Sequence, residues 1–260
     1  MEDDAAAAVA RLDALTRRLR RECPWDREQD ERSIVPHTVE EAYELADAAN
    51  AGDDAKLLDE LGDVLFQVHF LSLLLEERGS GDLAQVAEHC RQKLIRRHPH
   101  VFGEVEAHHA EEVLRNWDAI KAGEPGREPG IFGEVPENLP ALLHARKLQR
   151  RTASSGLDPA DAATAIDAVG AQAERLAAAR DERDERFDAV GDLLFAAVNA
   201  ARKLKVDPEL ALRSSSARFR ARVEAAERLA AADGAAWDEL TGDRRLGYYA
   251  RAALEQAGGE

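Results

Sequence analysis

The sequence contains few of the residues that build β-sheets. Aromatic residues make up only 5% of its 260 residues and runs of β-branched residues are scarce, whereas Ala and Leu dominate the 45% that are hydrophobic. Ala and Leu favour helices, while β-branched and aromatic residues favour strands. We therefore expect an all-α protein, long enough for one large domain or two smaller ones.

Disulfide frameworks and membrane-spanning segments are also excluded by what is missing. Two cysteines, Cys23 and Cys90, fit a reduced protein of the cytoplasm better than a disulfide scaffold. No apolar run approaches the roughly 18 residues of a membrane helix. The charged N-terminal segment lacks the apolar centre of a signal peptide. The sequence predicts a soluble, cytoplasmic protein without a membrane partner.

Positive charge is in short supply, with 35 basic against 51 acidic residues and a net charge of −16. Nucleic-acid-binding proteins normally carry a basic face, because phosphate contacts dominate their affinity. We therefore expect no nucleic-acid partner. A small phosphorylated ligand is still compatible with this charge if metal ions and a local basic cluster offset it.

Helical periodicity is clearest in the first half, where apolar residues recur at three- and four-residue steps and predict a long buried stripe. These residues are Leu57, Leu61, Val64, Leu65, Val68, Leu71, Leu74 and Leu75. A helix over about 37–50 precedes the stripe, with Gly52 as its cap and Asp53 or Asp54 as the next start. Further helices are expected over about 83–97, ended by Pro99, and about 111–121.

The pattern then repeats. "LGDVLF" at 61–66 returns as "VGDLLF" at 190–195, "RQKLIRR" as "SARFRAR", and "NWDAI" as "AWDEL", in the same order. Such ordered echoes indicate an internal duplication. The Gly- and Pro-rich segment between them predicts a linker. We expect a first unit at 1–122, a linker at 123–137 and a second unit at 138–260.

Four carboxylates define the candidate site. Glu41 and Glu44 are three residues apart, as are Glu60 and Asp63, and residues at this spacing lie about 60° apart around a helix and project together. The short "AGDD" turn makes the two helices antiparallel neighbours. An isolated EExxE segment is usually a solvated face. The second pair on the next helix favours a site for Mg²⁺, with Mn²⁺ as the alternative.

A basic cluster follows in "KLIRRHPHVFG". Lys93, Arg96 and Arg97 lie at the end of a predicted helix, where cations are favoured by the helix dipole alone. They could instead hold phosphate oxygens beyond the metal. Spacing does not separate these two interpretations, although an acidic metal pocket plus a basic cluster is the expected inventory for a phosphoanhydride substrate.

The ordered segments "CPWDREQ", "EEAYE", "ELGDVLFQV", "KLIRRHPHVFG" and "NWDAIKAGE" closely resemble the MazG nucleoside triphosphate pyrophosphohydrolases, and the second half resembles the tandem form of that family. The resemblance implies four-helix-bundle units, a homodimer, Mg²⁺ dependence and hydrolysis of nucleoside triphosphates to monophosphate and pyrophosphate, as in nucleotide-pool housekeeping. Carried over by position, the metal ligands and catalytic residues are Glu41, Glu44, Glu60 and Asp63.

Substrate contacts are expected from the remaining motif residues. Lys93, Arg96 and Arg97 would offset charge on the pyrophosphate leaving group. Trp25 and Trp117 are candidates for stacking on the base, and a core or dimer role for each fits the sequence equally well.

The second half departs from the ligand pattern. Aligning "AVGD" with "ELGD" sets Ala189 opposite Glu60 and keeps Asp192 opposite Asp63, while Gln172 and Arg175 replace the first carboxylate pair. One carboxylate and an arginine cannot hold Mg²⁺. We expect the second unit to be a structural partner with a degenerate site.

Two other classes of protein share some of these features. A di-iron carboxylate bundle needs repeated Glu-x-x-His pairs, and the chain has one such spacing, Glu106 to His109, away from the carboxylate helices. A non-catalytic helical interaction module is compatible with the degenerate half, but the complete ligand set of the first half argues against it.

Overall fold

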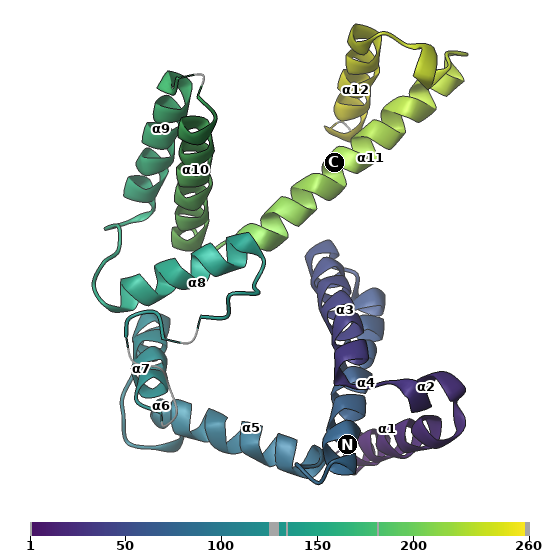
Figure 1. Cartoon of the computed structure of the whole chain (residues 1–260), viewed down its shortest axis with the longest axis vertical. Coiled ribbons are helices and arrows are strands. Elements are labelled where there is room, and N and C mark those ends of the chain that lie inside the picture. Colours follow the sequence, from purple (N-terminus) through teal and green to yellow (C-terminus); the bar gives the residue numbers. More distant parts are fainter. Residues whose placement is uncertain (1, 125–129, 134, 181, 258–260) are drawn as a thin grey trace. The chain divides into compact units, whose positions relative to one another are not determined.

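A computed structural model describes residues 2–124, 130–133, 135–180 and 182–257, and every regular element among them is a helix. The all-α prediction is confirmed. The helices form two units, Met1–Glu134 and Val135–Glu260 (Figure 1). Residues 125–129 and 134 of the expected linker lie outside the described residues.

The first unit is built around an antiparallel helix pair. Its helices are α1 (Glu2–Glu22), α2 (Pro24–Glu28), α3 (Glu31–Ala51), α4 (Asp54–Glu77), α5 (Leu83–Arg97), α6 (Pro99–Phe102) and α7 (Ala110–Ala122). Helices α3 and α4 pack side by side as a hairpin, and α1 packs on α4 (Figure 1). Helix α5 follows the far end of α4 and carries α6 and α7.

Capping residues fix the hairpin turn. Gly52 ends α3 with φ +68°, a conformation that glycine adopts without a steric penalty. The Asp53 carboxylate then accepts hydrogen bonds from the backbone amides of Ala55 and Lys56 at 3.1 and 3.0 Å, which caps α4. Two residues therefore reverse the chain, and they place the start of α4 beside the end of α3.

Two arginines of α1 form ion pairs that hold this helix on α4. Arg17 donates two hydrogen bonds to the Glu76 carboxylate at 2.9 and 2.6 Å, and Arg20 donates two to Glu77 at 2.9 Å each. Arg20 also donates to the carbonyl oxygens of Asp26 and Gln29. Bidentate pairs of this kind fix geometry as well as charge, so α1 is held at a defined position on α4, and α2 packs on α1.

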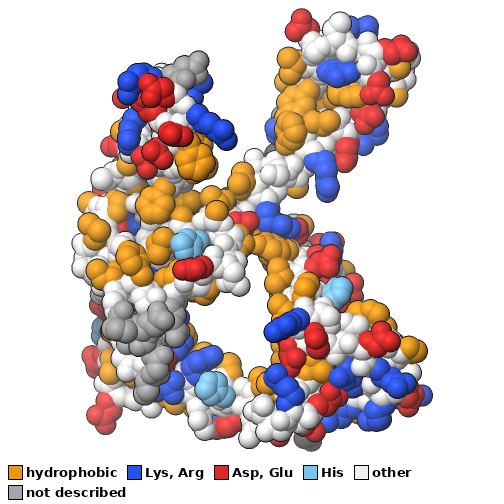
Figure 2. All heavy atoms as spheres, in the orientation of Figure 1, with side chains coloured by type: hydrophobic (Ala, Val, Ile, Leu, Met, Phe, Trp, Pro, Cys, Tyr) orange, Lys and Arg blue, Asp and Glu red, His pale blue; other side chains and the backbone are white. Residues whose placement is uncertain are grey.

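The core of the first unit lies on a different face of α4 from the one predicted. Ile34, Phe70 and Leu74 are almost fully buried together. By contrast, Leu61 is 50% exposed and Leu65 and Val68 are each 39% exposed. The prediction that the whole stripe is buried is therefore wrong, because α1 and α3 cover other faces of α4. Figure 2 shows hydrophobic side chains at the surface of the α3–α4 hairpin.

The second unit repeats the hairpin. Its elements are α8 (Ala141–Ser154), α9 (Ala162–Ala178), α10 (Arg183–Lys203), α11 (Pro208–Ala232), a 3-10 turn η1 (Trp237–Glu239) and α12 (Gly242–Ala257). Helices α9 and α10 pair as α3 and α4 do, and α8 packs on α10 and α11. A core of Ala226, Ala230, Leu240, Tyr248 and Ala252 joins α11 to α12.

Replacing Phe70 with Ala should destabilise the first unit, because its side chain is completely buried between α3 and α4. Large-to-small substitutions at such positions cost about 3–5 kcal/mol of unfolding free energy. Leu58→Ala on the same helix is the matched control, since Leu58 is 75% exposed. Denaturant unfolding followed by circular dichroism measures both; equal losses in the two variants would contradict the core assignment.

Candidate functional site

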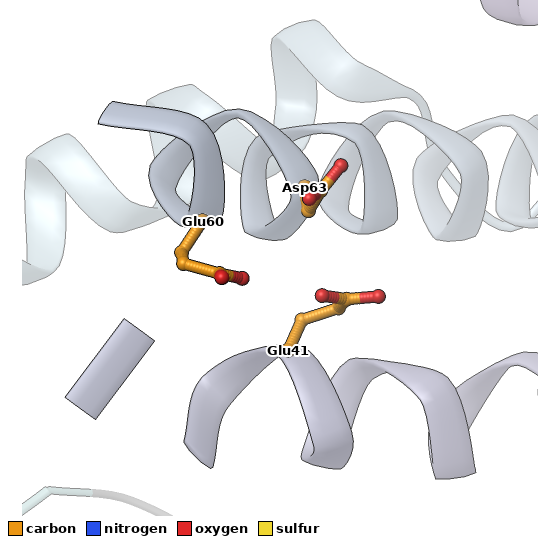
Figure 3. Close-up of side chains that lie close together, drawn as sticks. All are labelled: Glu41, Glu60 and Asp63. Atoms are coloured by element: carbon orange, nitrogen blue, oxygen red, sulfur yellow. The ribbon is translucent and has the colours of Figure 1, made fainter. Parts of the chain in front are cut away.

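Three carboxylates converge where α3 faces α4. Glu41 comes from α3, and Glu60 and Asp63 come from the second and third turns of α4 (Figure 3). One oxygen of each lies within 4.8 Å of the others. Glu60 is buried, Glu41 is half-buried and Asp63 is exposed, so the cluster opens to solvent at its Asp63 side.

The fourth predicted ligand, Glu44, is one turn further along α3 and exposed. It does not belong to the group of three whose oxygens lie within 4.8 Å. Its charge nevertheless acts on the cluster, because it helps to raise the pKa of both Glu41 and Glu60. Glu44 therefore lies at the margin of the site.

Burial and mutual repulsion disfavour the ionised carboxylates. The pKa of Glu41 is raised by burial, then by Asp63, Glu44 and Glu60. The pKa of Glu60 is raised by burial and then by Glu44, with Lys56 opposing the shift. Lys56 Nζ lies 3.9 Å from Glu60 Oε1. A cluster that one lysine offsets so weakly is chemically suited to a divalent cation with oxygen ligands.

The predicted basic residues lie elsewhere in the unit. Lys93, Arg96 and Arg97 occupy the last turns of α5, the helix that leads away from the end of α4 opposite the hairpin turn (Figure 1). The Glu124 carboxylate accepts hydrogen bonds from both arginines, at 2.8 Å from Arg96 Nη2 and 2.5 Å from Arg97 Nη2. The structure does not bring these cations to the carboxylates of the same chain.

Glu124 was not singled out from the sequence. The hydrogen bonds from Arg97 and Arg96 hold the pKa of the Glu124 carboxyl at about 2. The residue closes the "NWDAIKAGE" segment just after α7. A glutamate at the end of a helix carries no periodic signal that would reveal a distant arginine partner.

The two tryptophans of this unit differ in exposure and surroundings. Trp25 is 51% exposed, and its ring meets that of His37 edge-on with centroids 5.8 Å apart. His37 lies one helical turn before Glu41 on α3. Trp117 is half-buried on α7, with the guanidinium of Arg97 5.3 Å from its ring centroid. Trp25 therefore offers an accessible aromatic surface on α2, in contact with His37 of α3.

The corresponding position of the second unit has different chemistry. Ala189, opposite Glu60 in the alignment, is buried, and Asp192 is in an ion pair with Arg175 from α9, at 2.8 Å between Oδ2 and Nη1. The Oε1 atom of Gln172 is buried without a hydrogen-bond partner. An arginine therefore contacts the remaining aspartate at this position.

A family model matches part of the first unit. The family described as the MazG nucleotide pyrophosphohydrolase domain matches residues 29–102, the segment that contains all four predicted carboxylates and the basic cluster. A structural comparison finds a mazG-related protein from Thermotoga maritima, with 27% identity over 43% of this chain and 97% of that chain, at a TM-score of 0.38.

Curated relatives extend the likeness over nearly the whole chain. A nucleoside triphosphate pyrophosphohydrolase of Escherichia coli is 37% identical over 90% of this chain and 91% of its own length. The nucleoside triphosphate pyrophosphohydrolase/pyrophosphatase MazG of Thermotoga maritima is 37% identical over 88% of this chain and 89% of its own length. The chain therefore belongs to the MazG family of nucleoside triphosphate pyrophosphohydrolases.

Proposed function

We propose that the first unit hydrolyses nucleoside triphosphates to nucleoside monophosphate and pyrophosphate, with Mg²⁺ held by Glu41, Glu60, Asp63 and Glu44. The observation that carries the proposal is the convergence of three carboxylates within 4.8 Å at a place where their charges repel. Family membership supplies the reaction class. Removal of unwanted nucleotides from the cellular pool is the role that fits this reaction.

The donor set fits the proposed metal. Hard oxygen ligands on two rigid helices suit Mg²⁺, which retains waters and binds substrate phosphates; Mn²⁺ has similar ligand preferences. When bound, such an ion provides a Lewis acid for phosphate oxygens and lowers the pKa of a bound water. Release of pyrophosphate from a nucleoside triphosphate, measured with and without Mg²⁺, tests the function directly. A non-catalytic interaction module would release none.

The position of each carboxylate indicates the role that we assign to it. Glu60, buried and fixed between the helices, is suited to permanent coordination. Glu44 lies at the exposed margin and outside the close group of three. We assign to its carboxylate the orientation of the attacking water, since a ligand at the edge is the least committed to the metal.

Substrate recognition is proposed to combine an aromatic surface with a cation. Trp25 is half exposed beside the carboxylate helices and can stack on a nucleobase. The Lys93 side chain takes part in no hydrogen bond or ion pair among the described residues, so its ammonium group can bind a phosphate oxygen. Arg96 and Arg97 both pair with Glu124, and the Arg97 guanidinium lies against the Trp117 ring.

A homodimer accounts for the uncovered face of α4. Leu61, Leu65 and Val68 follow one another at helical spacing and are all at least 39% exposed. A second copy can cover this stripe with its own, as in a two-fold interface. The same arrangement would allow Lys93 of one copy to approach the carboxylates of the other copy. Within one chain, Lys93 does not approach them.

Among the described helices, none is both long and apolar enough to cross a membrane.

Asp63→Ala should abolish turnover, because it removes one of the three converging ligands. Asp192→Ala, at the aligned position of the second unit, should leave turnover within about twofold of wild type, since Asp192 is paired with Arg175. Pyrophosphate release at saturating Mg²⁺ measures both. Comparable losses in two folded variants would show that the second unit takes part in catalysis.

Trp25→Ala should raise KM for a nucleoside triphosphate about fivefold or more, since stacking contributes about 1–3 kcal/mol per base. Inorganic pyrophosphate contains no base, so its inhibition constant should not change. Steady-state kinetics with pyrophosphate as inhibitor measure both quantities. If the two constants rise together, Trp25 supports the fold of the site rather than the base.

Mixing Lys93→Ala with Asp63→Ala chains should restore activity that neither has alone. In a mixed dimer, the carboxylates of one chain meet the lysine of the other, and random association regenerates about a quarter of wild-type sites. Co-refolded variants are assayed for pyrophosphate release. Activity that stays at the level of the separate variants would mean that Lys93 acts within its own chain or not at all.

A further inference from the structure

Side chains of α3 and α4 face each other in four successive pairs along the inside of the hairpin. The pairs advance by three or four residues along α3 and go back by three or four along α4, as two antiparallel helices require. They are Ile34 with Phe70, Thr38 with Gln67, Glu41 with Asp63 and Glu44 with Glu60. The first pair belongs to the core and the last two belong to the carboxylate site. The Thr38–Gln67 pair therefore lies between the core and the site.

Gln67 is a buried amide with an incomplete set of hydrogen-bond partners. Its side chain belongs to a residue that is only 6% exposed. The Oε1 atom accepts a long hydrogen bond of 3.4 Å from Thr38 Oγ1, whose single proton is also directed at the Ile34 carbonyl at 3.3 Å. The Nε2 atom has no partner among the described residues, and it is not fully enclosed. Burying an amide with so few partners is unfavourable, so stability of the fold does not explain Gln67.

Helix geometry places Gln67 on the face of α4 that carries the carboxylates. Gln67 follows Asp63 by one turn and Glu60 by two turns, so it lies about 40° from the first and about 20° from the second around the helix axis. The next pair on its other side contains Phe70, which is completely buried. A partner for the Nε2 donor is therefore available on the carboxylate side.

We propose that Gln67 is a positioning residue of the cation site, held at Oε1 by Thr38 and donating from Nε2 to the carboxylates that bind the cation. This inference deepens the proposed function and rests on it. An amide donor orients a ligating carboxylate and favours its ionised form. Unlike Lys56, the other donor beside the cluster, an amide carries no positive charge that would repel the cation.

The second unit has lost this amide together with the carboxylates. Alignment of "LGDVLFQ" with "VGDLLFA" sets Ala196 opposite Gln67, just as it sets Ala189 opposite Glu60. Helices α9 and α10 nevertheless pack as a hairpin. A hairpin of this kind therefore forms without a glutamine at this position. Within this chain the buried amide accompanies the carboxylate cluster and is missing where Arg175 pairs with the remaining aspartate.

Binding of Mn²⁺ to the full chain without nucleotide tests the proposal, with free Mn²⁺ measured by its electron paramagnetic resonance signal. Gln67→Met keeps the length of the side chain and removes both polar groups. It should raise the Kd for Mn²⁺ about tenfold or more, as loss of an outer hydrogen bond to a metal ligand does. Its Tm in EDTA should not fall, because the change removes a poorly satisfied amide.

Thr38→Val should raise the Kd in the same direction but less, because it loosens Gln67 without removing the donor. The double variant Thr38→Val/Gln67→Met should then bind Mn²⁺ no more weakly than Gln67→Met alone, since Thr38 acts through Gln67. Additive losses in the double variant would contradict this dependence. If Gln67→Met does not fold, Thr38→Val decides the question, and a Kd equal to that of the wild type contradicts the proposal.

Two further variants separate the possible failures. Asp63→Ala should remove the Mn²⁺ binding of the site; if it does not, the proposed cation site itself is wrong. If Asp63→Ala removes binding while folded Gln67→Met binds as the wild type does, the positioning role is overturned and the proposed function stands. Ser72→Ala is the matched control, because Ser72 is 3% exposed on the same helix and its hydroxyl donates to the Val68 carbonyl at 2.7 Å. It should leave the Kd for Mn²⁺ unchanged.

Discussion

Repulsion between carboxylates across the α3–α4 hairpin is the constraint around which the first unit is arranged. Glu41, Glu60 and Asp63 are held with oxygens within 4.8 Å of one another, although burial and like charge raise the pKa of the first two. The geometry persists because it is imposed from elsewhere, by the Gly52 and Asp53 caps and by the core around Phe70. A ligand that binds only this folded arrangement stabilises it, which is the condition for a preformed cation site.

The second unit shows the same hairpin without the repulsion. Ala189 removes one carboxylate from the buried position, and Arg175 from the opposite helix neutralises Asp192 directly. The Arg175 guanidinium places positive charge beside Asp192, as a bound cation would. Unlike a metal ion, it has no coordination position to which a substrate could bind. The second unit thus neutralises its remaining aspartate with an arginine. In the first unit the converging carboxylates stay available to a cation.

Local features of the fold could be predicted well from the sequence. The helix 83–97 begins and ends as expected, because Asp82 caps it and Pro99 prevents its continuation. Gly52 and Asp53 perform the predicted capping roles for the same reason. Pairing Glu41 with Glu60 and Asp63 needed only helix periodicity and a short turn. Each of these inferences depends on residues close together in the sequence.

Predictions that depend on contacts between residues far apart in the sequence were either wrong or not made. Periodicity marks α4 as apolar on the face of Leu61, Leu65 and Val68 but cannot say whether another helix of the same chain covers it. The partner of Arg97 lies 27 residues away, beyond α6 and α7. The sequence does not reveal this pair, because the path of the chain between the two residues leaves no periodic pattern.

The charge balance of the site follows from these contacts. The chain carries a net charge of −16, and at the proposed site the three converging carboxylates would add to the repulsion of a triphosphate. Because Glu124 already neutralises much of the charge of Arg96 and Arg97, those two guanidinium groups do little to offset it. Under the proposed function, attraction for the phosphates would come from a bound cation together with Lys93. Substrate affinity should accordingly depend on the concentration of the divalent cation more steeply than it would if several free arginines lined the site.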